Sequence, residues 1–321
     1  MKTLSFLVLF LFFSNALFSQ DLTKVDKIMY SYNGITSIKE LSERIDYDFK
    51  TDIEKVRAIY TWIALNIEYD YFPSRLLKSP DFFVYNNDGD LKRIQQRKIK
   101  HAAQKTFRTK KGVCIGFAYL FHNICDLINI KSELIYGYTK TSADRIGIIP
   151  KEKNHVWNAV KINNKWLLMD VTFGSGYLYK DVWQRHLNLE YFNVKRSKLK
   201  LTHFPVDIKW RQFLKQKPLK EFCYAPLYKK GFLKNKLEVL TPKSGKIVTN
   251  NNKRIHIKLK KKTDNIRDVK YLFSSNYKIH NAQVINKETF SSIYLKPPKK
   301  NTTLHIYVNN ELSLEYKVKV N

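Results

Sequence analysis

The chain has 321 residues, of which 44% are hydrophobic, and its 58 Lys and Arg against 28 Asp and Glu give a formal net charge of +30. This length suits one large domain or two smaller ones with a real core, and the three cysteines exclude a disulfide framework. The charge favours an anionic neighbour, such as a membrane surface, a cell-wall polymer, nucleic acid or an acidic protein. Since the lysines are spread along the chain, a merely solvated cationic surface is an equal alternative. We expect an anionic cell-wall or membrane surface and no specific nucleic acid, and the oligomeric state stays open.

The first residues, MKTLSFLVLFLFFSNALFSQ, have the layout of a secretory signal peptide. One basic residue precedes an apolar run from Leu4 to Phe13, and small polar residues follow. The run falls short of the ~20 residues that a membrane span needs. We therefore expect residues 1–19 to be cleaved after Ser19, and the protein to be secreted or periplasmic.

Residues 20–50 are predicted to form a helical lead-in to a core domain that spans residues 51–215. The core is predicted to begin with a helix, because Thr51 and Glu54 have the spacing of a capping box. The apolar stripe of this helix consists of Val56, Ile59, Tyr60, Ile63 and Ile67. Residues 73–100 are polar and resemble a loop with a turn at 86–89, and a second helix is expected around residues 101–107.

A cysteine stands at the start of the next predicted helix, in KKGVCIGFAYLFHNIC at residues 110–125. Apolar residues recur at helical spacing after it, and Gly112 indicates the turn before it. Cys114 then lies in the first turn, where the positive end of the helix dipole favours a thiolate. Such a position suits a nucleophile, and it equally suits a small buried cysteine. Cys114 is predicted to be a free thiol, with Cys125 and Cys223 in the core.

Two alternating runs, HVWNAVKI and KWLLMDVTF, are separated by Asn163-Asn164, which predicts a β-hairpin because Asn tolerates positive φ. A strand is also expected at SELIYGYTK, before this hairpin. A two-residue turn places Trp157 opposite Asp170 and His155 opposite Thr172. These four side chains would share one face, with His155 and Asp170 as diagonal neighbours. A carboxylate beside an imidazole fixes its tautomer and stabilises the imidazolium, although each residue alone would more often be structural.

The residue composition and the hydrophobic pattern change after the core. Residues 216–232 contain two prolines and many lysines and are predicted to form a linker. Residues 233–321 alternate in short runs, typical of a β-sandwich of immunoglobulin size. The sequence has no CxxC or HExxH pattern and its histidines are scattered, so no metal site and no cofactor is expected.

The motifs together resemble the transglutaminase-like superfamily. They are Gly112-Val113-Cys114, His155-Val156-Trp157-Asn158 and Asp170-Val171-Thr172, in the order that the family shows. Residues 191–213 resemble the segment after the core in the kyphoscoliosis-peptidase-like branch. The likeness covers roughly residues 50–215, and within it the segment 194–200 is more basic than is usual for the family.

The resemblance implies an α+β, papain-like fold with a helix packed on an antiparallel sheet. It also implies a catalytic set of Cys114 as nucleophile, His155 as general base and acid, and Asp170 as orienting carboxylate. The expected function is that of a secreted cysteine acyl-transfer enzyme acting on protein amide or peptide bonds, by crosslinking, deamidation or proteolysis. The sequence does not choose among these outcomes and does not decide whether calcium is needed. The alternative is a non-catalytic adhesion or scaffold protein that retains the fold.

Overall fold

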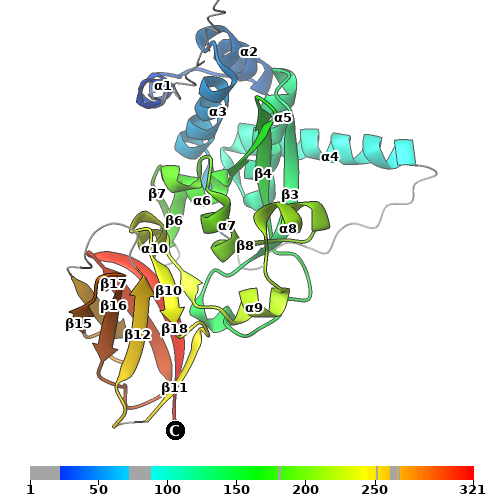
Figure 1. Ribbon diagram of the computed structural model, residues 1–321. Helices are drawn as coiled ribbons and strands as arrows, with labels where there is room; N and C mark the ends of the chain where they lie inside the picture. The colour runs from blue at the N-terminus through cyan, green and yellow to red at the C-terminus, as the bar shows by residue number, and fades with distance from the viewer. Residues whose placement is uncertain (1–21, 72–87, 180–181, 251, 261–265, 267) are drawn as a thin grey trace, which may run out of the picture.

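The computed structural model describes residues 22–71, 88–179, 182–250, 252–260, 266 and 268–321. The predicted signal peptide lies outside these residues. Helices gather at the top of the molecule in Figure 1, a four-stranded sheet lies in the middle, and the C-terminal strands lie at the bottom. Over the described residues, no helix combines the length and the apolar character needed to cross a bilayer.

Three helices open the described chain: α1 (Thr23–Met29), α2 (Ile38–Asp48) and α3 (Asp52–Asn66). The capping box predicted at the start of α3 is present, and the predicted stripe of α3 and Ile67 is fully buried. Arg57 on α3 donates two hydrogen bonds of 2.8 Å to Asp26 on α1, and Thr61 donates a third of 2.6 Å. This buried ion pair fastens the lead-in to the core.

The next two helices are α4 (Asp88–Thr109) and α5 (Cys114–Leu127). The prediction of a loop at residues 73–100 is wrong for residues 88–100, because α4 begins at Asp88 and runs for 22 residues to Thr109, through the helix expected around 101–107. Part of the expected turn at 86–89 lies outside the described residues. The short strands β1 (Glu68–Tyr69) and β2 (Lys111–Gly112) pair in parallel, and β2 brings the chain directly to the first residue of α5.

The core sheet has the order β5-β4-β3-β8 and is antiparallel throughout. Its strands are β3 (Ser132–Thr139), β4 (His155–Ile162), β5 (Lys165–Met169) and β8 (His203–Pro205), with a 3-10 turn η2 (Ala143–Arg145) between β3 and β4. The predicted hairpin is confirmed: Ile162 pairs with Lys165, and Asn163 and Asn164 have φ of 48° and 60°. Helix α5 packs against this sheet, which confirms the α+β class.

The second strand of the hairpin is shorter than predicted. Strand β5 ends at Met169, and the expected strand residues Val171 to Phe173 lie in the helix α6 (Val171–Ser175). The reason is local, because the Asp170 side chain accepts a hydrogen bond from the Phe173 N–H and caps this helix. The chain continues through β6 (Gly176–Tyr179), β7 (Val182–Arg185), η3 (Leu189–Tyr191), α7 (Arg196–Thr202) and α8 (Ile208–Leu214).

Residues 216–232, expected to form a linker, are packed into the molecule. They contain α9 (Leu219–Tyr224) and β9 (Leu227–Tyr228) and lead into α10 (Lys230–Lys234). The amine of Lys140, just after β3, donates to the carbonyls of Phe222, Ala225 and Pro226 at 2.7, 2.7 and 3.2 Å. Burial lowers the pKa of Lys140 to about 8. This side chain ties the core sheet to the segment that precedes the C-terminal strands.

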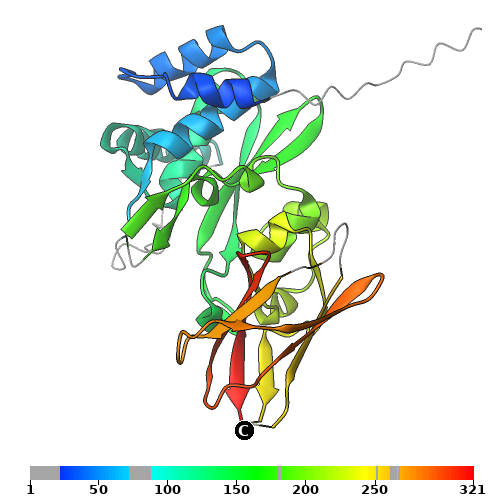
Figure 2. The ribbon, with the colours of Figure 1, turned by 90° about the vertical axis from the view of Figure 1, so that its left-hand side faces the viewer.

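Two sheets form the C-terminal part, as the predicted sandwich requires (Figure 2). One has the order β10-β12-β16-β15, and the other β11-β18-β17-β13-β14, with β9 added to β18. Alternate residues of β12, β13 and β17 are buried in a shared apolar core. The strands are β10 (Glu238–Thr241), β11 (Lys246–Thr249), β12 (Ile255–Lys260), β13 (Val269–Phe273), β14 (His280–Asn281), β15 (Gln283–Asn286), β16 (Phe290–Leu295), β17 (Thr302–Val308) and β18 (Glu311–Val320).

Candidate active site

Cys114 is the first residue of α5, as the sequence predicts. Val113 precedes it as the N-cap and provides no side-chain hydrogen bond to the helix. The positive end of the helix dipole, at the first-turn N–H groups, is therefore not offset by a capping side chain. The Cys114 side chain is buried at 4% exposure, between Ala118 of the same helix and Val156 of β4. All three cysteines are unpaired and buried, and Cys125 and Cys223 belong to apolar clusters.

The hairpin brings His155 and Asp170 together. His155 is the first residue of β4, and Asp170 directly follows β5. The Nε2 atom of His155 lies 2.6 Å from Oδ2 of Asp170, and both side chains are almost completely buried. Trp157 lies on the same side, with its ring stacked at 6.0 Å from the His155 ring. Thr172 does not complete this face, because it lies in α6.

The His155 ring also interacts with Cys114. Burial by itself would lower the pKa of His155, but the Asp170 carboxylate and, to a lesser extent, the nearby Cys114 side chain raise this pKa to about 10. Because Nε2 is occupied by Asp170, Nδ1 is the ring nitrogen left for the cysteine. The structure therefore shows a direct contact between His155 and Asp170, and Cys114 lies near enough to affect the pKa of His155.

A second histidine, which no sequence motif marks, completes the surroundings of Asp170. His203 on β8 is fully buried, and its Nε2 lies 2.8 Å from the same Oδ2 atom. Its Nδ1 lies 2.7 Å from the Thr202 hydroxyl. Burial lowers the pKa of His203, and the Asp170 charge opposes that shift only in part. A neutral His203 that donates from Nε2 and accepts from Thr202 satisfies both contacts.

Asp170 thus receives hydrogen bonds from three donors: His155, His203 and the Phe173 N–H. Burial would raise the pKa of its carboxyl group, but the two histidines overcome this effect and hold the pKa well below its usual range. The carboxylate is therefore charged, immobile and shielded from water. These are the properties that orient an imidazole and stabilise its protonated form.

The donor atoms of His155, Asp170 and His203 lie within 4.8 Å of one another, a combination that can bind a metal ion. No such cluster was expected, because the three residues are far apart in the sequence. Two atoms that ligate one zinc ion tetrahedrally lie about 3.3 Å apart, whereas both histidine nitrogens here approach a single carboxylate oxygen more closely, at 2.6 and 2.8 Å. The cluster as it stands is a hydrogen-bonded network.

Aromatic side chains form the walls around Cys114. Tyr136 of β3 packs beside it, and the Tyr136 and Tyr119 hydroxyls are 2.7 Å apart. Tyr69 of β1 lies close enough that a charged Cys114 would raise its pKa, although burial is the larger cause of the shift. The Tyr69 ring stacks on Trp183 of β7 at 5.8 Å. The cysteine therefore lies in an apolar, aromatic environment that limits its contact with water.

Comparison with known proteins shows which family part of this chain resembles. Residues 39–171 match the family model of the transglutaminase-like superfamily. The chain is 28% identical to human kyphoscoliosis peptidase over 244 residues, which cover 73% of this chain and 34% of that protein. It is 23% identical to the Lim and transglutaminase domain protein ltd-1 of Caenorhabditis elegans over 236 residues, 66% of this chain and 30% of that protein.

The chain thus spans about a third of the length of these relatives. A solved structure of a TGase is 15% identical and covers 56% of this chain and 40% of its own, with a TM-score of 0.27. The family match includes the helix of Cys114, the strand of His155 and Asp170 itself. The chain therefore contains a segment, residues 39–171, that matches the transglutaminase-like superfamily.

Proposed function

We propose that this protein is a cysteine acyl-transfer enzyme that acts on amide or peptide bonds of polypeptides through Cys114, His155 and Asp170. The observation that carries the proposal is the buried contact of 2.6 Å between His155 and Asp170. Cys114 supports it, because it stands at a helix start without a side-chain cap and contributes to the raised pKa of His155. Three segments far apart in the chain converge on this arrangement. The superfamily of the domain and the names of its relatives agree with it.

In the proposed reaction, the Cys114 thiolate attacks the carbonyl carbon of a carboxamide or peptide bond. The tetrahedral intermediate collapses when protonated His155 gives its proton to the leaving nitrogen, and an acyl thioester on Cys114 remains. His155 then removes a proton from an amine or a water molecule, which attacks the thioester and regenerates the thiolate. Asp170 holds the imidazole through Nε2 and stabilises the imidazolium in both halves of the reaction.

The nature of the second nucleophile determines the outcome. An amine gives crosslinking, whereas water gives deamidation or proteolysis, depending on the bond attacked. The burial of Cys114 restricts access to the thiol for both the amide substrate and the second nucleophile. A scaffold protein that retains this fold without turnover is the competing proposal, and the experiment below separates the two.

The site of action is proposed from the sequence. We propose that residues 1–19 direct the chain out of the cytoplasm, and that its net charge of +30 holds it to an anionic cell-wall or membrane surface. Sequencing of the N-terminus of the mature protein tests the first part, and salt-dependent release from the cell envelope tests the second.

The activity is tested with a lysine-methylated protein substrate and a biotinylated alkylamine. Amine incorporation, ammonia release and new N-termini are measured side by side. We expect at least one of them for the wild type, none for Cys114→Ala, and retention in Cys125→Ala, which removes another buried thiol from the same helix. Equal signals for the wild type and Cys114→Ala would reject the enzymatic proposal.

A further inference from the structure

A cavity of about 590 Å³ lies at the edge of the core sheet, where β3 and β8 meet α8 and the start of α9. Its volume is in the range of sites that hold a side chain or small ligand. Its apolar wall includes Tyr138, Phe204 and Leu219, which belong to one cluster. Among the described residues that line it there is no acidic side chain, whereas Arg211, Lys215 and Lys217 are all present.

The cavity adjoins the wall of the candidate active site. Tyr136 packs beside Cys114, and Tyr138 stands two residues further along β3 on the same face. Val206, which lines the cavity, donates a hydrogen bond of 2.9 Å from its N–H to the Tyr136 carbonyl. An extended peptide advances about 3.3 Å per residue. A side chain a few residues away from the reacting amide therefore reaches this space.

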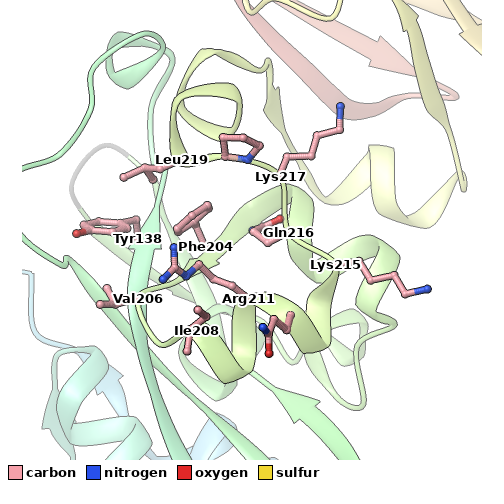
Figure 3. Close-up of a pocket in the computed structure, with 11 residues that line it drawn as sticks. Tyr138, Phe204, Val206, Ile208, Arg211, Lys215, Gln216, Lys217 and Leu219 are labelled. Atoms are coloured by element: carbon pink, nitrogen blue, oxygen red, sulfur yellow. The ribbon is translucent and has the colours of Figure 1, made fainter.

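Arg211 is the charged group directed into the cavity. Figure 3 shows it pointing from α8 toward Phe204 and Tyr138, whereas Lys215 and Lys217 extend outward. Its Nε atom is buried without a hydrogen-bond partner, and no acidic residue is among the described residues that line the cavity. A buried donor left unpaired is unfavourable. A carboxylate that enters the cavity can pair with the planar guanidinium through two parallel hydrogen bonds.

We propose that this cavity binds an acidic side chain, Glu or Asp, of the polypeptide substrate, and that Arg211 binds its carboxylate. The aromatic and aliphatic wall would hold the methylene groups of that side chain, and the two exposed lysines would attract it. This inference rests on the proposed function, because it assigns the cavity to the same substrate that Cys114 attacks.

The test measures binding without turnover, by fluorescence anisotropy with the full chain carrying Cys114→Ala. The probes are dye-labelled Ser/Gly peptides with a single Gln, in which one Glu is moved through the four positions on each side. The reference peptides carry Ala at those positions. We expect one position at which Glu tightens binding about tenfold, as a charged hydrogen bond allows, and less so at high salt.

Adding Arg211→Gln should bring the Glu-to-Ala affinity ratio close to one, and Arg211→Lys should keep part of the preference. The matched control is Arg97→Gln, because Arg97 is exposed on α4 and its loss changes the net charge equally. A preference that survives Arg211→Gln, or no preference at any position, would overturn the assignment.

Failure of this inference and failure of the proposed function give different results. A preference for Glu that depends on Arg211, in a protein whose wild type has no activity, supports the cavity and rejects the enzyme. Turnover with the same kcat/KM for Glu and Ala peptides at every position supports the enzyme and rejects the cavity assignment.

Discussion

His203→Phe is the substitution that most sharply separates a positioning role for this histidine from simple packing. The His203 ring lies among aromatic rings, with centroids 4.8 Å from Trp157 and 5.2 Å from Phe173. Phenylalanine keeps a ring in that space but cannot donate a proton to Asp170. The variant thus removes one of the two histidine donors from the Asp170 carboxylate, and the phenyl ring still fills the space of the imidazole.

The size of the effect follows from the contact of 2.8 Å between His203 and Asp170. A hydrogen bond to a charged group contributes about 1.5–3 kcal/mol, and one pKa unit corresponds to about 1.4 kcal/mol. The pKa of Asp170 should therefore rise by about one to two units, and the free energy of unfolding at pH 7 should fall by about 1.5–3 kcal/mol. Because Asp170 has a lowered pKa in the wild type, the stability advantage of the wild type over this variant should be complete above about pH 4 and should shrink as the pH falls further.

The assay is urea unfolding between pH 2 and 7. We expect His203→Phe to be less stable than the wild type at pH 7 and to approach it as the pH falls below about 4, with a smaller loss in His203→Gln, whose amide can donate to Asp170. His256→Phe is the matched control, because that histidine is stacked on Tyr294 in the C-terminal sheet. A stability difference that is the same at every pH in His203→Phe, or no rescue by glutamine, would refute the positioning role.

Three further predictions concern the same network and the N-terminal helices. His155 has a folded pKa of about 10 and an unfolded pKa near 6.5, so its stabilisation is complete below pH 6.5 and is lost as the pH rises to 10. The stability advantage of the wild type over His155→Gln should shrink across that window in urea unfolding, and a constant advantage would contradict the raised pKa. Asp170→Asn should weaken alkylation of Cys114 at pH 5 less than His155→Ala does, and the reverse order would count against the assigned roles. Arg57→Met should lower the free energy of unfolding by about 3–5 kcal/mol, because the buried Asp26 carboxylate loses both of its hydrogen bonds from Arg57. Lys27→Met, at an exposed position of the same helix as Asp26, should change the free energy of unfolding little. A loss below about 1 kcal/mol for Arg57→Met would show that the ion pair does not hold α1 to α3.

The hairpin could be derived from the sequence because its determinants are local. Asn163 and Asn164 adopt the positive φ values that a two-residue turn requires, and the period of two along the strands then fixes which side chains share a face. The contact between His155 and Asp170 follows from that count. The count fails at Thr172 because the Asp170 side chain caps a helix, and an N-cap aspartate has the same appearance in sequence as a strand residue.

His203 could not be found in this way, because β8 has only three residues and pairs with β3 over a long sequence separation. One signal was present in Gly137, which interrupts the β3 pattern. A Cβ atom there would lie 2.2 Å from the Phe204 carbonyl oxygen, so glycine allows β8 to approach closely. Helix α4 was underestimated for a different reason. Its residues are good helix formers, but turn-forming residues stand at its beginning and few apolar positions mark its period.

Acid-quenched mass spectrometry of the protein during turnover of a glutamine-containing peptide tests directly whether Cys114 is the nucleophile. We expect an acyl adduct on the proteolytic fragment that contains Cys114. This adduct should be released by hydroxylamine, as a thioester is, and should be missing from Cys114→Ala and present in Cys125→Ala. Turnover that continues in Cys114→Ala, or a thioester found on Cys125 or Cys223, would contradict the assignment of Cys114 as the nucleophile.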